Sequence, residues 1–136
     1  MIFGIGTDIV QIARIERALE RHGERFAQKI LCAPEFADFQ QRRHPAAFLA
    51  KRFAAKEATA KAMGIGFRHG MSLQHIEVVH DAVGKPSLLF HDRALVLKEA
   101  LGCGAAYLSM ADETDTAIAF VTILLDANRV PSLLPR

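Results

Sequence analysis

The segment AIAFVTILL, at positions 117–125, constrains the fold more than any other part of this sequence. Its residues are apolar apart from one threonine, and an unbroken apolar run of this length predicts a strand that is covered on both faces. The whole chain has only 136 residues, and a domain of this size has too little material to cover both faces of every strand. We therefore expect part of the sheet surface to be buried between copies of the chain in a homo-oligomer.

The remaining segments predict helices mostly in the first half of the chain and antiparallel strands mostly in the second. Apolar patterns, glycines and prolines predict an opening strand at 2–10 and helices at 12–21, 24–31, from 34 to before 45, 46–63 and 92–101. Segments 75–81 and 86–91 predict a hairpin, and a turn at 112–115 connects a strand at 105–112 to the final strand. These elements predict one α+β domain over residues 1–125, followed by a tail over residues 126–136.

The composition is typical of a soluble globular chain, with 51% hydrophobic and 24% charged residues. The apolar N-terminus is short, is interrupted by Asp8 and follows no basic segment, so it does not resemble a signal peptide. No apolar run is long enough to span a bilayer. Cys32 and Cys103 lack the spacing of metal or redox sites, which indicates reduced thiols. We expect a cytoplasmic protein without a membrane partner.

Asp8 is the first candidate functional residue, because it places a carboxylate near the end of the apolar opening strand. A buried carboxylate is costly unless a cation, a metal ion or hydrogen-bond donors accompany it. Position alone favours a simpler role, in which Asp8 caps the helix that follows. The strand by itself does not exclude either role.

The alanine-rich helix at 46–63 carries a second candidate set, Lys56, Glu57 and Lys61. Glu57 and Lys61 are four residues apart and share a face, so the helix taken by itself favours an exposed salt bridge. The functional alternative directs both side chains at a metal-bound phosphate. Mg²⁺ prefers a few carboxylates together with phosphate oxygens and water, and a lysine adds a point charge to the same phosphates.

Basic residues gather on the first predicted helix, where Arg14, Arg17 and Arg21 fall within a stripe of roughly 80°. The apolar residues of this helix lie on the opposite side, so the stripe is either an ordinary exposed face or a surface for an acidic partner. Its nearly uniform positive charge slightly favours the acidic partner. Nucleic acid is a weaker candidate, because the net charge is only +2 and the chain has one Tyr and no Trp.

Three segments match one known family in residue order as well as residue type. They are GIGTDIVQIARIE at 4–16, FLAKRFAAKEATAKAMG at 48–64 and GKP at 84–86. Together they resemble the holo-acyl-carrier-protein synthases, the small bacterial 4′-phosphopantetheinyl transferases, and the resemblance extends from Ile2 to about Leu125. It implies the α+β phosphopantetheinyl transferase fold, with antiparallel strands packed with helices, and a homotrimer that binds coenzyme A in clefts between its subunits.

The resemblance also implies roles for the candidate residues. Asp8 and Glu57 correspond to the carboxylates that hold Mg²⁺, and Lys61 corresponds to a lysine at the phosphates. The arginine stripe corresponds to the surface that meets an acidic acyl carrier protein. Asp112 receives no role, because this position varies in the family. Contacts with coenzyme A fall on residues of the helix and turn motifs, namely Arg52, Lys61, Gly64, Gly84, Lys85 and Pro86.

The implied reaction transfers the phosphopantetheine arm of coenzyme A to a serine of apo-acyl carrier protein and releases adenosine 3′,5′-bisphosphate. Mg²⁺ would neutralise the pyrophosphate and the leaving oxygen. The catalytic roles fall on Lys61, which would add to that stabilisation, and on Glu57, which would accept the serine proton directly or through a metal-bound water. The alternative is a non-catalytic module that binds coenzyme A or an acidic protein, but such a module would not need both Asp8 and Glu57.

Overall fold

The structure is a computed structural model that describes residues 1–128, so positions 129–136 of the predicted tail lie outside the described residues. Its first elements are β1 (Ile2–Gln11), α1 (Ile12–His22), α2 (Glu24–Ile30), α3 (Ala33–Phe39) and α4 (Pro45–Met63). They are followed by the 3₁₀ helix η1 (Leu73–His75), β2 (Ile76–His80), β3 (Pro86–Phe90), α5 (Asp92–Leu101), β4 (Cys103–Asp112) and β5 (Thr116–Leu125). The predicted α+β class is confirmed. The sequence does not predict η1, because a helix of three residues shows no periodic pattern.

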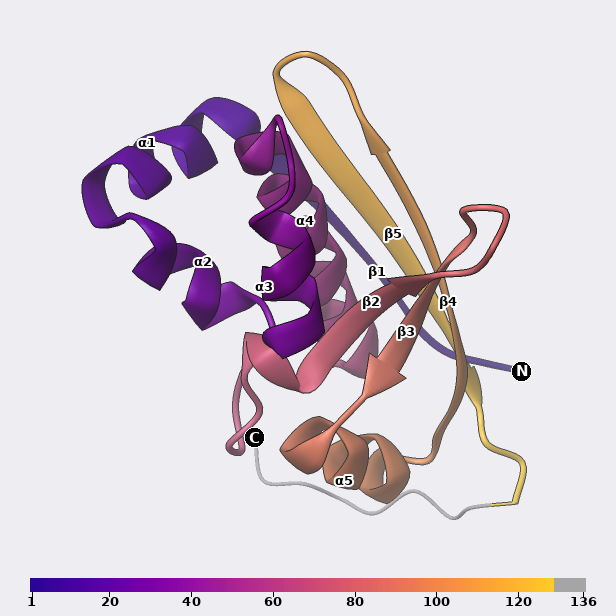
Figure 1. Cartoon of the computed structure of the whole chain (residues 1–136). Coiled ribbons are helices and arrows are strands. Elements are labelled where there is room, and N and C mark those ends of the chain that lie inside the picture. Colours follow the sequence, from indigo (N-terminus) through magenta and orange to yellow (C-terminus); the bar gives the residue numbers. More distant parts are fainter. Residues whose placement is uncertain (129–136) are drawn as a thin grey trace.

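Two antiparallel sheets organise the strands (Figure 1). The larger sheet has the order β1-β5-β4, so the last strand of the chain lies between the other two. The smaller sheet is the hairpin of β2 and β3, in which Ile76 pairs with Phe90. Helix α4 lies along one face of the larger sheet. Helices α1, α2 and α3 pack around the sides of α4 that do not face this sheet (Figure 1). Within residues 1–128, no helix has both the length and the apolar character needed to cross a membrane.

Two glycines bring the backbone of β1 directly against α4. A Cβ atom added to Gly6 would collide with the carbonyl oxygen of Ala58 and would lie 2.7 Å from the backbone nitrogen of Ala62. A Cβ atom added to Gly4 would collide with the carbonyl oxygen of Ala62. Small residues on both sides therefore let the strand and the helix approach closely, and this contact places the first half of β1 beside the last turns of α4.

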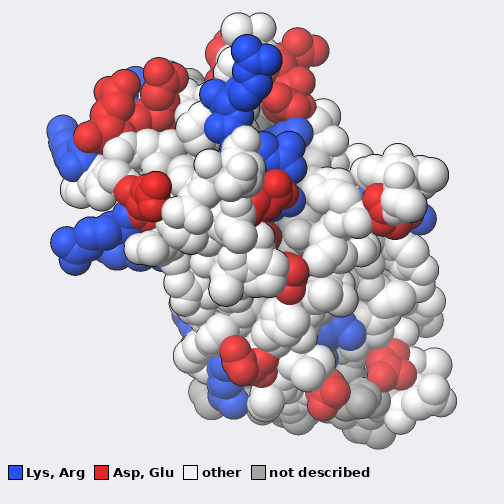
Figure 2. Space-filling view, in the orientation of Figure 1, with Lys and Arg blue, Asp and Glu red and all other residues white. Residues whose placement is uncertain are grey.

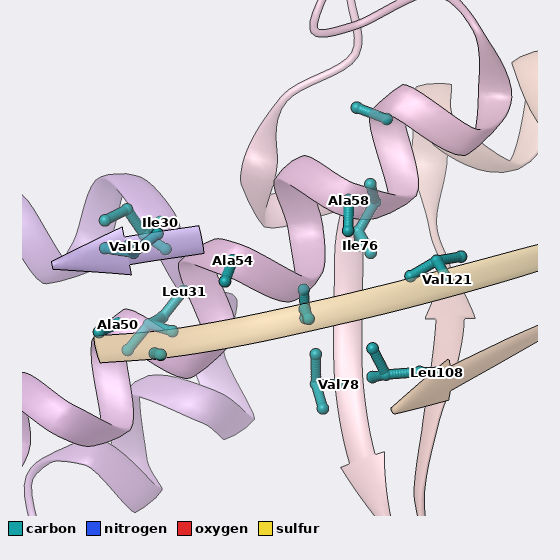
Figure 3. Close-up of a cluster of buried hydrophobic side chains, with 14 of the residues drawn as sticks. Val10, Ile30, Leu31, Ala50, Ala54, Ala58, Ile76, Val78, Leu108 and Val121 are labelled. Carbon is teal, nitrogen blue, oxygen red and sulfur yellow. The ribbon is translucent and has the colours of Figure 1, made fainter. Parts of the chain in front are cut away.

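The central strand β5 alternates between a buried face and an exposed face. Ala117, Ala119, Val121 and Ile123 are buried against α4, and Figure 3 shows side chains of α4, β5 and β2 meeting in this core. Phe120 points away from α4 and is 46% exposed. The described chain therefore covers only one of the two faces that the apolar sequence of β5 predicts to be covered.

The uncovered side of the larger sheet forms an apolar surface, which we call the outer sheet face. It is made of exposed side chains from all three strands, namely Ile5, Ile9, Tyr107, Ile118 and Phe120. Exposed apolar patches on this scale are typical of protein–protein contacts. The arrangement is consistent with the homo-oligomer expected from the sequence.

A buried ion pair connects α3 to α4. Lys56 is fully buried, and its Nζ lies 2.5 Å from Oε1 of Glu35 and donates to the carbonyl oxygen of Ile30 at 2.7 Å. Oε2 of Glu35 accepts a hydrogen bond from the backbone nitrogen of Val78 at 3.0 Å, which adds β2 to the network. Burial lowers the pKa of Lys56, and the charge of Glu35 opposes that shift. These contacts indicate a structural role for Lys56, unlike its neighbour Glu57.

Candidate active site

The close contact of β1 with α4 brings together three of the predicted site residues, Asp8, Glu57 and Lys61. Nζ of Lys61 lies 2.9 Å from Oδ1 of Asp8 and donates to the carbonyl oxygen of Thr7 at 3.0 Å. The side chain of Lys61 is 53% exposed and that of Asp8 is 17% exposed, so the pair is accessible from solvent. Glu57 lies one helical turn before Lys61 and is only partly buried.

Both simpler interpretations of these residues are wrong. The residue at the N-cap of α1 is Gln11, and Asp8 cannot cap this helix because β1 continues for three more residues before α1 begins. Among residues 1–128, the carboxylate that pairs with Lys61 is Asp8 and not Glu57. The helix pattern favoured the local pair, but Lys61 instead reaches across to a strand that lies next to α4 in the fold.

The environment of Glu57 is suited to a divalent cation. Burial raises the pKa of Glu57, the negative charge of Asp8 raises it further, and Lys61 opposes both effects. Two carboxylates that repel each other across a short gap are stabilised when a cation lies between them, and their hard oxygen atoms are the ligands that Mg²⁺ prefers. Residues 1–128 contain no group of three or more His, Cys, Asp or Glu side chains placed to hold a metal. Further ligands would therefore come from water and from substrate phosphates.

A larger cleft, with a volume of about 870 Å³, lies between α3, the first turns of α4 and β2. The predicted coenzyme A ligand Arg52 is in its wall, and the guanidinium stacks on Phe48 at 3.9 Å from the ring centroid. Among residues 1–128 the buried Nε of Arg52 has no hydrogen-bond partner, although it forms an ion pair with Oε2 of Glu35 at 3.6 Å. A buried donor without a hydrogen bond is uncommon, and the charge of this guanidinium is balanced by Glu35 and Asp38.

The cleft is also lined by basic residues that the sequence did not predict as site residues. They are Arg42, Arg43, His44, Lys51 and His80. Acidic residues partly compensate them, because Arg42 pairs with Asp38 at 2.8 Å and Lys51 pairs with Asp112 at 3.3 Å. Burial lowers the pKa of His80, and the positive charges of Arg52, Lys51 and Arg42 lower it further. The sequence signal for this cleft is the run RRH at 42–44, immediately before α4, since basic residues beside a helix N-terminus favour anions.

The other residues predicted to contact coenzyme A lie at the end of α4 and at the β2–β3 hairpin. Gly64 ends α4 with a left-handed conformation, φ 82°. Gly84 and Lys85 lie in the turn of the β2–β3 hairpin and Pro86 begins β3; in the turn, Oδ1 of Asp81 accepts a hydrogen bond from the backbone nitrogen of Lys85 at 2.9 Å. This turn projects away from α4 (Figure 1), so a single chain does not bring it to the Asp8 cluster.

The three stripe arginines do gather on one surface. Arg14, Arg17 and Arg21 line a shallow hollow of about 240 Å³ on α1, and each is exposed. Acidic side chains also lie over the α1 end of the molecule, so this region carries both signs of charge (Figure 2). The stripe itself remains continuous, as its spacing predicts.

Comparison with known proteins shows which family this chain is similar to. A model of the 4′-phosphopantetheinyl transferase superfamily matches residues 4–121. The chain is 56% identical to the holo-[acyl-carrier-protein] synthase of Halorhodospira halophila, over 91% of this chain and 98% of that protein. It is 50% identical to the protein of the same name from Nitrosospira multiformis, over 90% of this chain and 98% of that protein.

Solved structures agree with this relationship. The holo-[acyl-carrier-protein] synthase of Neisseria meningitidis superposes with a TM-score of 0.85 at 48% identity, over 90% of this chain and 98% of that one. A Bacillus anthracis holo-(acyl-carrier-protein) synthase in complex with CoA (3′,5′-ADP) superposes with a TM-score of 0.75 at 34% identity, over 90% of this chain and 96% of that one. The fold expected from the motifs is confirmed. The chain therefore belongs to the 4′-phosphopantetheinyl transferase superfamily.

Proposed function

We propose that this protein transfers the 4′-phosphopantetheine arm of coenzyme A to a serine of apo-acyl carrier protein, with Mg²⁺ bound, and releases adenosine 3′,5′-bisphosphate. The observation that carries the proposal is the meeting of Asp8, Glu57 and Lys61 at one accessible point, where two distant segments of the chain come together. The names of the relatives, which share about half of this sequence, support the same reaction.

Each residue of the cluster has a task in this reaction. Asp8 and Glu57 would hold Mg²⁺, which when bound supplies positive charge to the pyrophosphate and to the leaving oxygen. Lys61 places an ammonium group beside the same phosphates. A carboxylate oxygen of Glu57 accepts the proton of the attacking serine, directly or through water.

The basic cleft is suited to the nucleotide end of coenzyme A, because the arginine, lysine and histidine side chains that line it match a phosphate-bearing ligand. Adenosine 3′,5′-bisphosphate is expected to raise the pKa of His80, since the bound anion offsets the cations that now lower it. Titration of the histidine ring protons by NMR, with and without the nucleotide, measures this shift. His22, which lies on α1, is the internal control. A pKa of His80 that stays constant or falls would place the nucleotide elsewhere.

The arginine stripe on α1 is suited to an acidic carrier protein. Arg21→Glu is expected to raise the KM for the carrier about tenfold or more at low salt, because a repulsive charge replaces an attractive one. The affinity for coenzyme A should stay the same. Steady-state kinetics with each substrate varied in turn separate the two effects. Arg93→Glu, on α5 at the other end of the molecule, is the charge-matched control. Equal changes for both substrates would contradict this division of roles.

The outer sheet face is the proposed contact of a homotrimer, because it is apolar and the site residues of one chain do not all meet. Light scattering is expected to give three times the chain mass of 15.0 kDa. Phe120→Arg should reduce this to one chain mass, since a charge would be buried in an apolar contact. Val96→Arg alters an exposed apolar residue of α5 and should leave the assembly intact. A trimer that survives Phe120→Arg would exclude this face as the contact.

Intact-mass spectrometry tests the function itself. Apo-acyl carrier protein is incubated with this protein, coenzyme A and Mg²⁺, and a parallel sample contains EDTA. The carrier is expected to gain the mass of one phosphopantetheine, and EDTA should abolish the gain. If several carriers remain unmodified although coenzyme A binds, the protein is a binding module rather than a transferase.

A further inference from the structure

In this structure the ammonium group of Lys61 contacts Asp8, a carboxylate that would also hold the divalent cation. This ammonium group lies 2.9 Å from Oδ1 of Asp8 and also bonds the carbonyl oxygen of Thr7. A divalent cation bound to Asp8 would use Oδ1, which Lys61 already contacts, or would lie beside Lys61 on Oδ2. In either position the cation and the ammonium group repel each other, so each weakens the hold of the other on this carboxylate.

The contact between Lys61 and Asp8 can break easily. More than half of the Lys61 side chain is exposed, whereas Asp8 is largely covered. An exposed lysine–carboxylate pair contributes little stability, about 0–1 kcal/mol, so it yields readily to a stronger competitor. The lysine side chain is also long and flexible, and Lys61 occupies the last turn of α4. A short movement therefore takes its ammonium group away from Asp8 while its backbone stays fixed.

The contact also has a purpose before any metal binds. The carboxylates of Asp8 and Glu57 have the same charge and repel each other, and the ammonium group of Lys61, 2.9 Å from Oδ1 of Asp8, offsets part of that repulsion. An ammonium group on Asp8 therefore stabilises the arrangement of the two carboxylates in the metal-free protein.

We propose that Lys61 is a positioning residue that takes the place of the divalent cation on Asp8 in the metal-free chain, and that cation binding releases its ammonium group for the substrate phosphates. The proposal rests on the proposed metal-dependent function. It goes beyond that function by making Lys61 a competitor of the metal as well as a partner of the phosphates. Loss of Lys61 then has opposite effects on two measurable quantities, metal affinity and turnover.

The first test measures Mn²⁺ binding without coenzyme A by electron paramagnetic resonance, on the full chain. Lys61→Gln is expected to bind Mn²⁺ about two- to fivefold more tightly than the unaltered protein, because the competitor is gone. Lys29→Gln removes the same charge from an exposed position on α2 and should leave the affinity unchanged. Turnover of Lys61→Gln should fall while its metal affinity rises, a combination that a purely structural role of Lys61 would not produce.

The second test uses the unaltered protein, so it does not depend on the stability of a variant. NMR of the lysine side-chain nitrogen atoms, with Lys61→Gln identifying the signal, should show a restricted ammonium group at Lys61 without metal. Added MgCl₂ should make this group mobile and leave Lys29 unaffected. An ammonium group that stays restricted, or an Mn²⁺ affinity that is equal in Lys61→Gln and the unaltered protein, would overturn the release proposal alone. Absence of Mn²⁺ binding even with coenzyme A would overturn the metal-dependent function as well.

Discussion

Asp8→Asn is expected to lower kcat/KM for phosphopantetheine transfer by about 100-fold or more, because a neutral amide replaces a carboxylate that would hold the divalent cation. Asp8 has no neighbour able to take over this role, since residues 1–128 offer no third acidic, histidine or cysteine ligand at the site. The measurement is the initial rate by intact mass of the carrier, with thermal melting to confirm folding. Glu113→Gln, an exposed carboxylate in the β4–β5 turn, is the control and should keep its activity.

Glu57→Gln separates two tasks that Asp8→Asn cannot separate. If Glu57 only helps to hold the cation, saturating Mg²⁺ should restore turnover. If Glu57 also accepts the serine proton, turnover should stay low at every Mg²⁺ concentration. Full recovery at saturating Mg²⁺ would exclude Glu57 as the base.

Gly6→Val is expected to destabilise the protein by about 3 kcal/mol or more, because its side chain would meet the backbone of α4 at Ala58 and Ala62. Backbone atoms of a buried helix cannot move aside as a flexible side chain can. Urea unfolding followed by circular dichroism measures the change in the free energy of unfolding. Ala111→Val places the same larger side chain on an exposed position of β4 and should cost far less. An unchanged unfolding midpoint in Gly6→Val would contradict the close approach of β1 and α4.

The sequence predicted those features that depend on neighbours along the chain. Helix ends at Gly23, Gly64 and Gly102 and the hairpin around Gly84 follow from local turn chemistry, and the structure confirms them. The pairing of Lys61 with Asp8 depends on residues 53 positions apart, so the helix pattern favoured the wrong partner. The family motifs brought the two residues into one site, but did not predict their direct contact.

Glu35 and Lys56 show why the sequence did not predict the contacts that are buried between helices and strands. Glu35 lies in the first turn of a short helix, where an acidic residue is normally exposed. Its burial depends on α4 and β2, which come later in the chain. One signal was present, because α4 has apolar residues on nearly every side and a helix of this kind is buried all round. A lysine in its middle then has to find a buried partner.

The outer sheet face also affects the behaviour of a newly made chain. A folded but unassembled copy exposes Ile9, Tyr107 and Phe120 on a sheet whose outer strands β1 and β4 each pair with only one other strand within residues 1–128. Such surfaces favour indiscriminate association, and a net charge of +2 provides little colloidal repulsion to oppose it. Orderly assembly through this face would therefore protect the protein from precipitation, so that its solubility and its quaternary structure depend on the same few side chains.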